Sequence, residues 1–255
     1  MTDPEELLAV ARDAARVAGA ALLQHYGRAT GIGTKSGGHD PVSDADRQAE
    51  ELIVERLARS RPEDGLLGEE GAERATRTGI TWVIDPLDGT TNYLYEFPGW
   101  AVSVAAVDDE GGLAGVVHDP LRDELFTAVR GAGAHLGARR LSVNEPVRLA
   151  DALVNAGFSY NSADRRREAR LAEELLPRIR DLRGTGSVAL GLAWVAAGRT
   201  DAFFQNRSSP WDWAAGVLIA RAAGAVVHVD EDTGCVVAAG PALAPALTPL
   251  VTLPE

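Results

Sequence analysis

The chain has 255 residues, of which 45% are hydrophobic and 24% are charged, enough for a well-buried core in one domain or in two closely packed halves. Its 25 lysines and arginines against 37 aspartates and glutamates give a net charge of −12, which disfavours binding to nucleic acid or to anionic membranes. Without a long apolar stretch, a basic signal peptide or a second cysteine beside Cys235, we expect a cytoplasmic protein free of disulfides.

The first 60 residues have the pattern of two helices. Asp3 and Pro4 form a helix start, with a cap and a proline at the first helical position, and apolar residues follow at helical spacing. The glycine-rich segment 31–40, which carries Lys35, is typical of a loop. A second helix is expected over 43–60, with its apolar side chains on one side.

The pattern changes to strands between residues 66 and 147. Short apolar runs, which are typical of strands, occur at 66–68, 80–84, 100–107, 113–118 and 124–129. The acidic and glycine-rich segment 108–112 predicts a hairpin turn between two of them.

Helices return in the last hundred residues. Expected helices cover 164–176 (with Asp164 as the cap), 187–197 and 211–223, and a strand covers 225–229. The order is therefore helices, then antiparallel-looking strands, then alternating helices and strands. This order favours layered α and β elements over a dinucleotide-binding sheet, and the sequence has neither of the glycine-rich nucleotide-binding motifs.

The most informative segment is Trp-Val-Ile-Asp-Pro-Leu-Asp-Gly-Thr-Thr-Asn at 82–92, in which an apolar strand meets two carboxylates. Asp85 and Asp88 lie on a sharp turn and can point at one position. Two converging carboxylates repel each other unless a hard cation lies between them, and oxygen ligands suit Mg²⁺ better than zinc or copper. Gly89 allows close backbone approach, and Thr90 adds a hydroxyl. The segment therefore predicts a metal-assisted phosphoryl-transfer site.

Three further acidic clusters lie at the ends of expected elements. They are 40–46 with Asp46, 68–70 with Glu69, and 210–216 with Asp212. Each alone could be a helix cap, a solvated pair or an acid stabilised by a helix dipole. That structural interpretation would have to hold four times, each time at the end of an element, which favours a shared site.

These motifs, in this order and spacing, resemble the inositol monophosphatase family of Mg²⁺-dependent, lithium-sensitive phosphatases. The resemblance covers nearly the whole chain. It implies an α+β fold, a layered α-β-α-β-α sandwich, with an N-terminal half (1–148) that carries most metal ligands and a C-terminal half (149–255) that supplies Asp212 and the substrate pocket. It also implies a homodimer.

The resemblance further implies a role for each matching position. Glu69, Asp85 and the carbonyl of Leu87 would hold one Mg²⁺; Asp85, Asp88 and Asp212 would hold a second, and a third, weaker ion would lean on Glu69. The implied catalytic residues are Asp46, Thr90 and Glu69, with Asp46 bonding the Thr90 hydroxyl to orient the attacking water. The implied substrate contacts are Asp88, Gly89, Thr90, Ser187, Val188, Gln205 and Asp212, and Lys35 would lie on a loop over the site.

The substrate is less clearly indicated. Thr91 and Asn92 resemble the inositol branch and favour myo-inositol 1-phosphate, whereas Gln205 stands where that branch usually has a glutamate that binds inositol hydroxyls. Histidinol phosphate, fructose 1,6-bisphosphate and 3′-phosphoadenosine 5′-phosphate are alternatives. Arg207 is either a solvated loop arginine or a cation that favours a second anionic group on the substrate. A non-catalytic binding protein on the same fold is a further alternative, although such a protein would be expected to lose a metal ligand.

Overall fold

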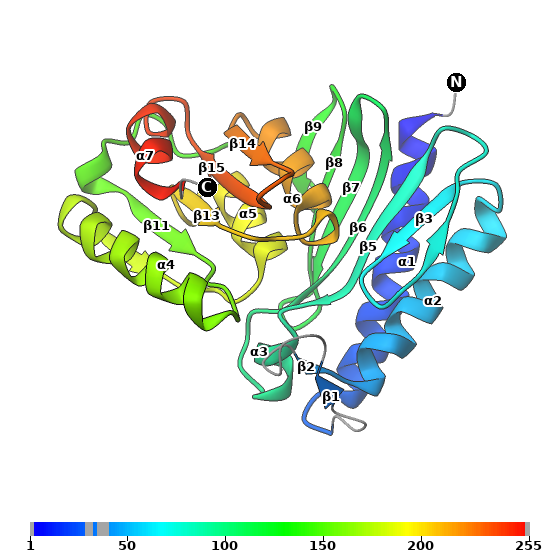
Figure 1. Ribbon diagram of the computed structural model, residues 1–255. Helices are drawn as coiled ribbons and strands as arrows, with labels where there is room; N and C mark the ends of the chain where they lie inside the picture. Colours follow the sequence, from blue (N-terminus) through cyan, green and yellow to red (C-terminus); the bar gives the residue numbers. More distant parts are fainter. Residues whose placement is uncertain (1–2, 29–32, 35–40, 253–255) are drawn as a thin grey trace.

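The chain forms seven α-helices within residues 3–28, 33–34 and 41–252, which the computed structural model describes (Figure 1). The helices are α1 (Pro4–His25), α2 (Asp44–Ser60), α3 (Thr90–Leu94), α4 (Ser162–Leu175), α5 (Val188–Ala196), α6 (Pro210–Ala222) and α7 (Ala244–Val251), with short 3₁₀ turns at Leu149–Asp151 and Leu176–Arg178.

Two large sheets and one small strand pair account for the strands. The 8-stranded sheet has the order β10-β9-β8-β7-β6-β5-β3-β4, and the 5-stranded sheet has the order β12-β11-β13-β15-β14. The first sheet contains β3 (Gly65–Gly68), β4 (Glu73–Arg74), β5 (Thr81–Asp88), β6 (Ala101–Asp108), β7 (Gly111–Asp119), β8 (Glu124–Val129), β9 (Gly133–Leu136) and β10 (Arg139–Arg140). The second contains β11 (Leu153–Ala156), β12 (Asp181–Arg183), β13 (Ala202–Gln205), β14 (Val226–Asp230) and β15 (Cys235–Ala239), while β1 (Gly33–Thr34) pairs with β2 (Pro41–Val42).

The elements stack in five layers, which confirms the expected α-β-α-β-α arrangement (Figure 1). On β5, Trp82 and Ile84 pack against α1 and α2, whereas Val83, which points to the opposite face, packs against α5 and α6. The same two helices also pack on the 5-stranded sheet through contacts that include Phe203. Finally, α4 and α7 cover the far face of that sheet. The division into halves at residue 148 stays a prediction.

Most of the expected elements lie close to their predicted bounds, with two corrections. The cap of α4 is Asn161, whose side chain accepts from the backbone N–H groups of Ala163 and Asp164, so Asp164 lies in the first turn instead of capping it. The strands between 66 and 147 are not all antiparallel, because β3 pairs with β5 in parallel. None of the described helices has the length and hydropathy to cross a membrane.

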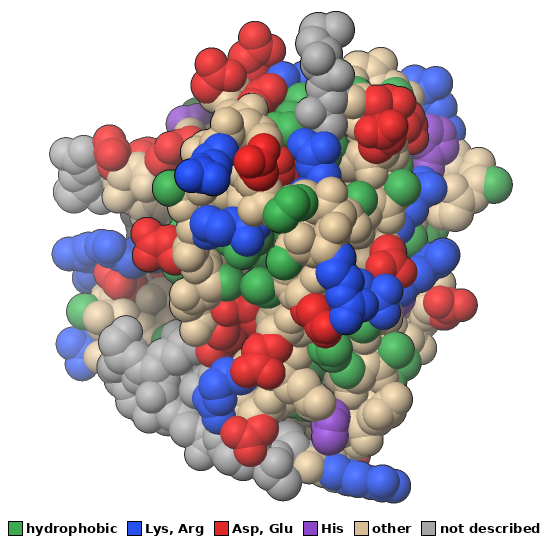
Figure 2. Space-filling view, turned by 90° about the vertical axis from the view of Figure 1, so that its right-hand side faces the viewer, with side chains coloured by type: hydrophobic (Ala, Val, Ile, Leu, Met, Phe, Trp, Pro, Cys, Tyr) green, Lys and Arg blue, Asp and Glu red, His purple; other side chains and the backbone are tan. Residues whose placement is uncertain are grey.

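The face that carries α1 and α2 has a mixed charge distribution. Acidic and basic side chains are interspersed over the visible surface of this face, as Figure 2 shows. Several of them form exposed ion pairs, such as the pair between Arg56 of α2 and Asp13 of α1 at 3.1 Å. Such pairs add little stability, so the core layers carry most of it.

Close packing between α5 and α6 predicts that Gly216→Ala destabilises the protein. A Cβ at Gly216 would lie 2.8 Å from the Cβ of Leu192, well inside contact distance. Overpacking of this kind typically costs about 1–3 kcal/mol, which exceeds the roughly 0.5–1 kcal/mol that alanine gains over glycine within a helix. We therefore expect a lower free energy of unfolding in urea.

Gly184→Ala is the matched control, because its Cβ would have its nearest neighbour, a carbonyl oxygen, at 3.7 Å. A Gly216→Ala variant as stable as this control would contradict the close packing of α5 on α6.

Candidate active site

A bulge in β5 brings Asp85 and Asp88 to one side of the sheet. Asp85 pairs with Ser103 and Asp88 pairs with Ala101, so β5 has one more residue than β6 across this stretch. Residues three apart in a regular strand point to opposite faces, and the extra residue removes that alternation. Both carboxylates line the same pocket of about 710 Å³.

Parallel pairing of β3 with β5 places Glu69 beside Asp85. Gly68 lies opposite Ile84, and the Glu69 N–H donates to the Ile84 carbonyl at 3.2 Å. The turn after β3 is held by Glu50 of α2, which accepts from the N–H groups of Glu70 at 3.0 Å and Ala72 at 2.9 Å. Glu69 therefore has a fixed backbone next to the bulge of β5.

Asp212 reaches the same pocket from the first turn of α6. Ser209 caps this helix, and its N–H donates to the Asp212 carboxylate at 2.6 Å, which forms a capping box with the Ser209 side chain. Asp212 is therefore oriented by its own helix while it lines the pocket with Glu69, Asp85 and Asp88.

Thr90, the first residue of α3, is hydrogen-bonded to Asp46 of α2. The Thr90 hydroxyl lies 3.1 Å from both the Asp46 carboxylate and the Leu87 carbonyl. Asp46 is 1% exposed and accepts from the N–H of Ser43 in a capping box. The first turn of α2 thus holds an acid that keeps the Thr90 hydroxyl in place.

Two donors from the start of α5 bind Asp88. The Ser187 hydroxyl and the Ala189 N–H each donate to the same carboxylate oxygen at 2.6 Å. Ser187 is 3% exposed and lies outside the pocket lining, whereas Val188, Gln205, Gly89, Thr90 and Leu87 all belong to the lining. Lys35 lies outside the described residues.

Asp85 and Asp88 have strongly perturbed acidities. Burial raises the pKa of Asp85 well above its usual range, and the charges of Glu69, Asp88 and Asp212 raise it further. Burial also raises the pKa of Asp88 to about 7, against the opposing hydrogen bonds from Ser187 and Ala189. Each charged form is therefore unfavourable unless a proton or a cation compensates it.

The donor set suits a hard divalent cation. Among the described residues, no group of three or more histidine, cysteine, aspartate or glutamate side chains has the spacing of a metal site, so binding would have to draw these carboxylates closer together. All the clustered groups are nevertheless oxygen donors, the neighbouring acids repel Asp85, and Leu87 lines the same pocket. Such a set matches Mg²⁺ in chemistry.

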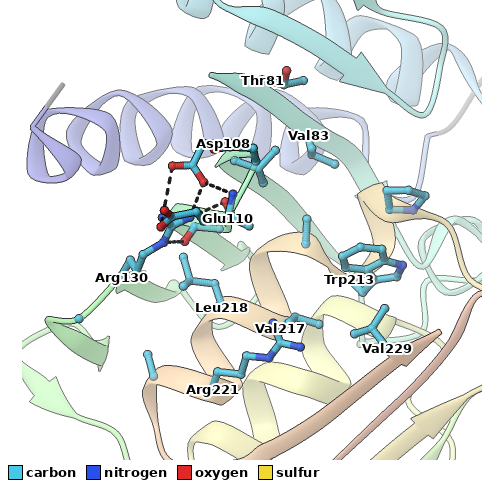
Figure 3. Close-up of a pocket in the computed structure, with 18 of the residues that line it drawn as sticks. Thr81, Val83, Asp108, Glu110, Arg130, Trp213, Val217, Leu218, Arg221 and Val229 are labelled. Carbon is cyan, nitrogen blue, oxygen red and sulfur yellow. Dashed lines mark hydrogen bonds and ion pairs between the residues drawn. The ribbon is translucent and has the colours of Figure 1, made fainter. Parts of the chain in front are cut away.

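A larger cavity, of about 1020 Å³, lies between α6 and the hairpin of β6 and β7 (Figure 3). Its charged residues Asp108 and Glu110 are bound by Arg130, which donates to Asp108 at 2.6 Å and to Glu110 at 3.2 Å. Trp213, Val217 and Leu218 of α6 line another part of it. Because Arg130 binds Asp108 and Glu110 in this larger cavity, we place the chemistry in the smaller pocket.

Supporting residues were missed by sequence reasoning. Glu50 is one helical turn from Asp46 on α2, a spacing that could have indicated a shared side. The motif contained Asn92, but its role was missed: it donates to the carbonyls of Gly99 and Thr185, both at 2.7 Å. Tyr160, whose hydroxyl lies 2.9 Å from that of Thr91, had no sequence signal.

Comparisons with known proteins show which family the sequence resembles. The model of the inositol monophosphatase family matches residues 3–251. An inositol-1-monophosphatase of Mycobacterium leprae is 39% identical, with 96% of this chain and 93% of that protein covered. A Nus factor SuhB of Xylella fastidiosa is 44% identical over 84% of this chain and 78% of its own.

Solved structures give the same result. The extragenic suppressor protein SuhB of Bartonella henselae superimposes with a TM-score of 0.91 at 34% identity, covering 98% of this chain and 100% of that chain. An IMPase of Thermotoga maritima gives a TM-score of 0.86 at 30% identity, with 94% of each chain covered.

Repulsion within the acidic cluster predicts that Asp85→Asn stabilises the metal-free protein. A carboxyl whose pKa is raised by folding contributes stability below its unfolded pKa and loses that contribution as pH rises through the folded value. In EDTA at pH 8 we expect the variant to exceed the wild type by on the order of 1–3 kcal/mol in unfolding free energy. The difference should shrink as the pH is lowered toward about 4.

The measurement is urea unfolding in EDTA across this pH range, with the exposed Asp232→Asn as the control. A pH-independent difference, or a loss of stability at pH 8, would contradict the repulsion. Addition of Mg²⁺ should reverse the order of the two proteins.

Proposed function

We propose that this chain, which belongs to the inositol monophosphatase family, is a Mg²⁺-dependent phosphatase that hydrolyses a small phosphate monoester with water. The observation that carries the proposal is the convergence of Glu69, Asp85, Asp88 and Asp212 on one pocket beside the hydrogen-bonded pair of Thr90 and Asp46. A purely structural role does not account for mutually repelling acids at the ends of β3, β5 and α6.

The proposed cofactor is Mg²⁺, in two to three ions, with Glu69, Asp85, Leu87, Asp88 and Asp212 as ligands. When bound, it would lower the pKa of the attacking water and neutralise charge on the leaving oxygen. This neutralisation would also allow a phosphate to enter a pocket that otherwise repels it.

The remaining steps belong to residues of the chain. Thr90 donates its hydroxyl proton to Asp46 or to Leu87, so its oxygen can accept a hydrogen bond from the water and hold it for in-line attack. Glu69, only partly buried at the pocket wall, accepts a proton from that water. Gly89, at φ 97°, and Thr90 begin α3 with N–H groups that can bind phosphate oxygens.

Myo-inositol 1-phosphate is the substrate we propose first. Thr91 and Asn92 line the pocket after Thr90, and Gln205 lines it from the end of β13. Gln205 can donate and accept hydrogen bonds to hydroxyl groups, although a glutamate would bind them more strongly. Histidinol phosphate, fructose 1,6-bisphosphate and 3′-phosphoadenosine 5′-phosphate stay as alternatives.

A second candidate function is non-catalytic binding of a partner. The names of several relatives, which are called Nus factor SuhB, favour it. The full set of acids at the pocket favours catalysis instead. A homodimer and a cytoplasmic location complete the proposal, and the exposed aromatic rings of Tyr95 (82% exposed) and Phe97 (55%) beside α3 supply an apolar surface for a second copy.

The first test is phosphate release from these four substrates with Mg²⁺, with EDTA and with added Li⁺. We expect turnover of myo-inositol 1-phosphate that EDTA and the Asp85→Asn substitution abolish and that Li⁺ inhibits, because Asp85 is the most buried of the clustered acids. Asp232→Asn serves as the control. If turnover is fastest with one of the other three substrates, the proposed mechanism is kept and the proposed substrate changes. A folded protein inactive on every substrate would favour the binding function.

A second test replaces Gln205 by glutamate. The added charge strengthens hydrogen bonds from inositol hydroxyls by roughly 1 kcal/mol, or about fivefold in affinity. We therefore expect Gln205→Glu to raise kcat/KM for myo-inositol 1-phosphate relative to histidinol phosphate. An unchanged ratio would place residue 205 outside the part of the pocket that binds the sugar.

A further inference from the structure

Arg207 brings a positive charge to the wall of the active-site pocket. Among the described residues that line this pocket, it is the one lysine or arginine. It follows β13 by two residues and shares the lining with Gln205 of that strand and with Asp212 of α6. Its side chain is 56% exposed, so the guanidinium is open to a ligand that enters the pocket.

The backbone around Arg207 is fixed on both sides. Arg207 itself has φ 61°, a left-handed conformation that is unfavourable for a residue with a side chain. The next residue, Ser208, donates both its N–H (2.8 Å) and its hydroxyl (2.7 Å) to the Gly234 carbonyl. Ser209 then caps α6 and binds Asp212. The strained residue is therefore held at a defined place relative to a proposed metal ligand.

Asp164 holds the side chain of Arg207. The closest approach is 3.0 Å, between Nε of Arg207 and the Asp164 carboxylate in the first turn of α4. The Asp164 side chain is 12% exposed, so this partner is itself fixed. A guanidinium has further N–H donors on its terminal nitrogens, and one held at its Nε edge can present the others to a ligand. An ion pair this exposed on one side is weak, so it orients Arg207 without preventing contact with a second anion.

A second acid nearby is engaged elsewhere. Glu168 of α4 is 1% exposed and accepts from the Ser159 N–H at 2.9 Å. Burial raises the pKa of this carboxyl, which reduces its charge relative to an exposed glutamate at the same pH. Its hydrogen bond supports the segment of Ser159 and Tyr160, both of which line the pocket. Glu168 therefore supports the pocket wall, while Asp164 is the partner of Arg207.

From this arrangement we propose that Arg207 binds a second phosphate group, carried by the leaving group of the substrate, and that Asp164 positions it. The inference rests on the proposed phosphatase function. It adds small bisphosphates to the proposed substrates: one phosphate would be hydrolysed at the acidic cluster and the other bound by Arg207. The planar guanidinium suits this role because it binds phosphate oxygens through two parallel hydrogen bonds.

The test compares myo-inositol 1-phosphate with myo-inositol 1,4-bisphosphate, which differ by one phosphate. We expect Arg207→Gln to lower the ratio of kcat/KM for the bisphosphate to kcat/KM for the monophosphate by roughly tenfold, mainly through a higher KM for the bisphosphate. Arg207→Lys should recover part of the ratio, because an ammonium retains the charge and loses the paired geometry. Asp164→Asn should raise KM for the bisphosphate with kcat little changed.

Arg166→Gln is the matched control, because Arg166 is an exposed arginine of α4 outside the pocket lining. An equal ratio in Arg207→Gln and the wild type would overturn the proposal. If the wild type turns over neither substrate, calorimetric measurement of the binding of both substrates in the presence of Ca²⁺ separates the phosphatase function from the anion-binding role of Arg207. Loss of bisphosphate binding in Arg207→Gln would then support the anion site at Arg207 but not the phosphatase function. Unchanged binding would reject both the anion site and the phosphatase function.

Discussion

Mutual repulsion among buried carboxylates is the constraint on which the site depends. Asp85 and Asp88 are 1% and 7% exposed, and Glu69 and Asp212 lie close enough to raise the pKa of Asp85. Burying such groups together costs free energy that the acids cannot recover from one another. The backbone must therefore impose their positions, and three separate devices do so: a bulge in β5, the parallel pairing of β3 with β5, and the capping box of α6.

Hydrogen bonds from main-chain N–H groups then lower the free energy that is needed to bury these carboxylates together. Asp46 and Asp212 accept from the N–H groups of their helix caps, and Asp88 accepts from the start of α5. These donors favour the charged form, whereas burial favours the neutral one. For Asp88 the two effects oppose each other, and burial outweighs the hydrogen bonds because its pKa stays raised to about 7.

The chain order of helices and strands and the main motifs could be predicted from sequence, because caps such as Asp3 and runs such as 124–129 act locally. Strands β11, β13 and β15 were missed, since they are short, apolar runs that periodicity cannot distinguish from helix. The acids were found through their motifs, yet nothing local indicates that Glu50 holds the turn after β3 or that Ser187 serves Asp88. The Glu50 contact joins residues that lie 20 positions apart in the sequence, and the Ser187 contact joins residues that lie 99 positions apart.

In the proposed function, chemistry and selectivity come from different parts of the fold. Glu69, Asp85 and Asp88 stand at the ends of strands of the first sheet, whose register fixes them. Other lining residues come from the end of β13 and from the segment before α4, through Gln205, Arg207 and Tyr160. Side chains at these positions can change without disturbing the strand pairing that holds the acids, because they occupy strand ends and turns. A family motif therefore identifies the reaction far better than the leaving group, and the proposed selectivity of this chain depends on side chains such as Gln205 and Arg207 at strand ends and turns.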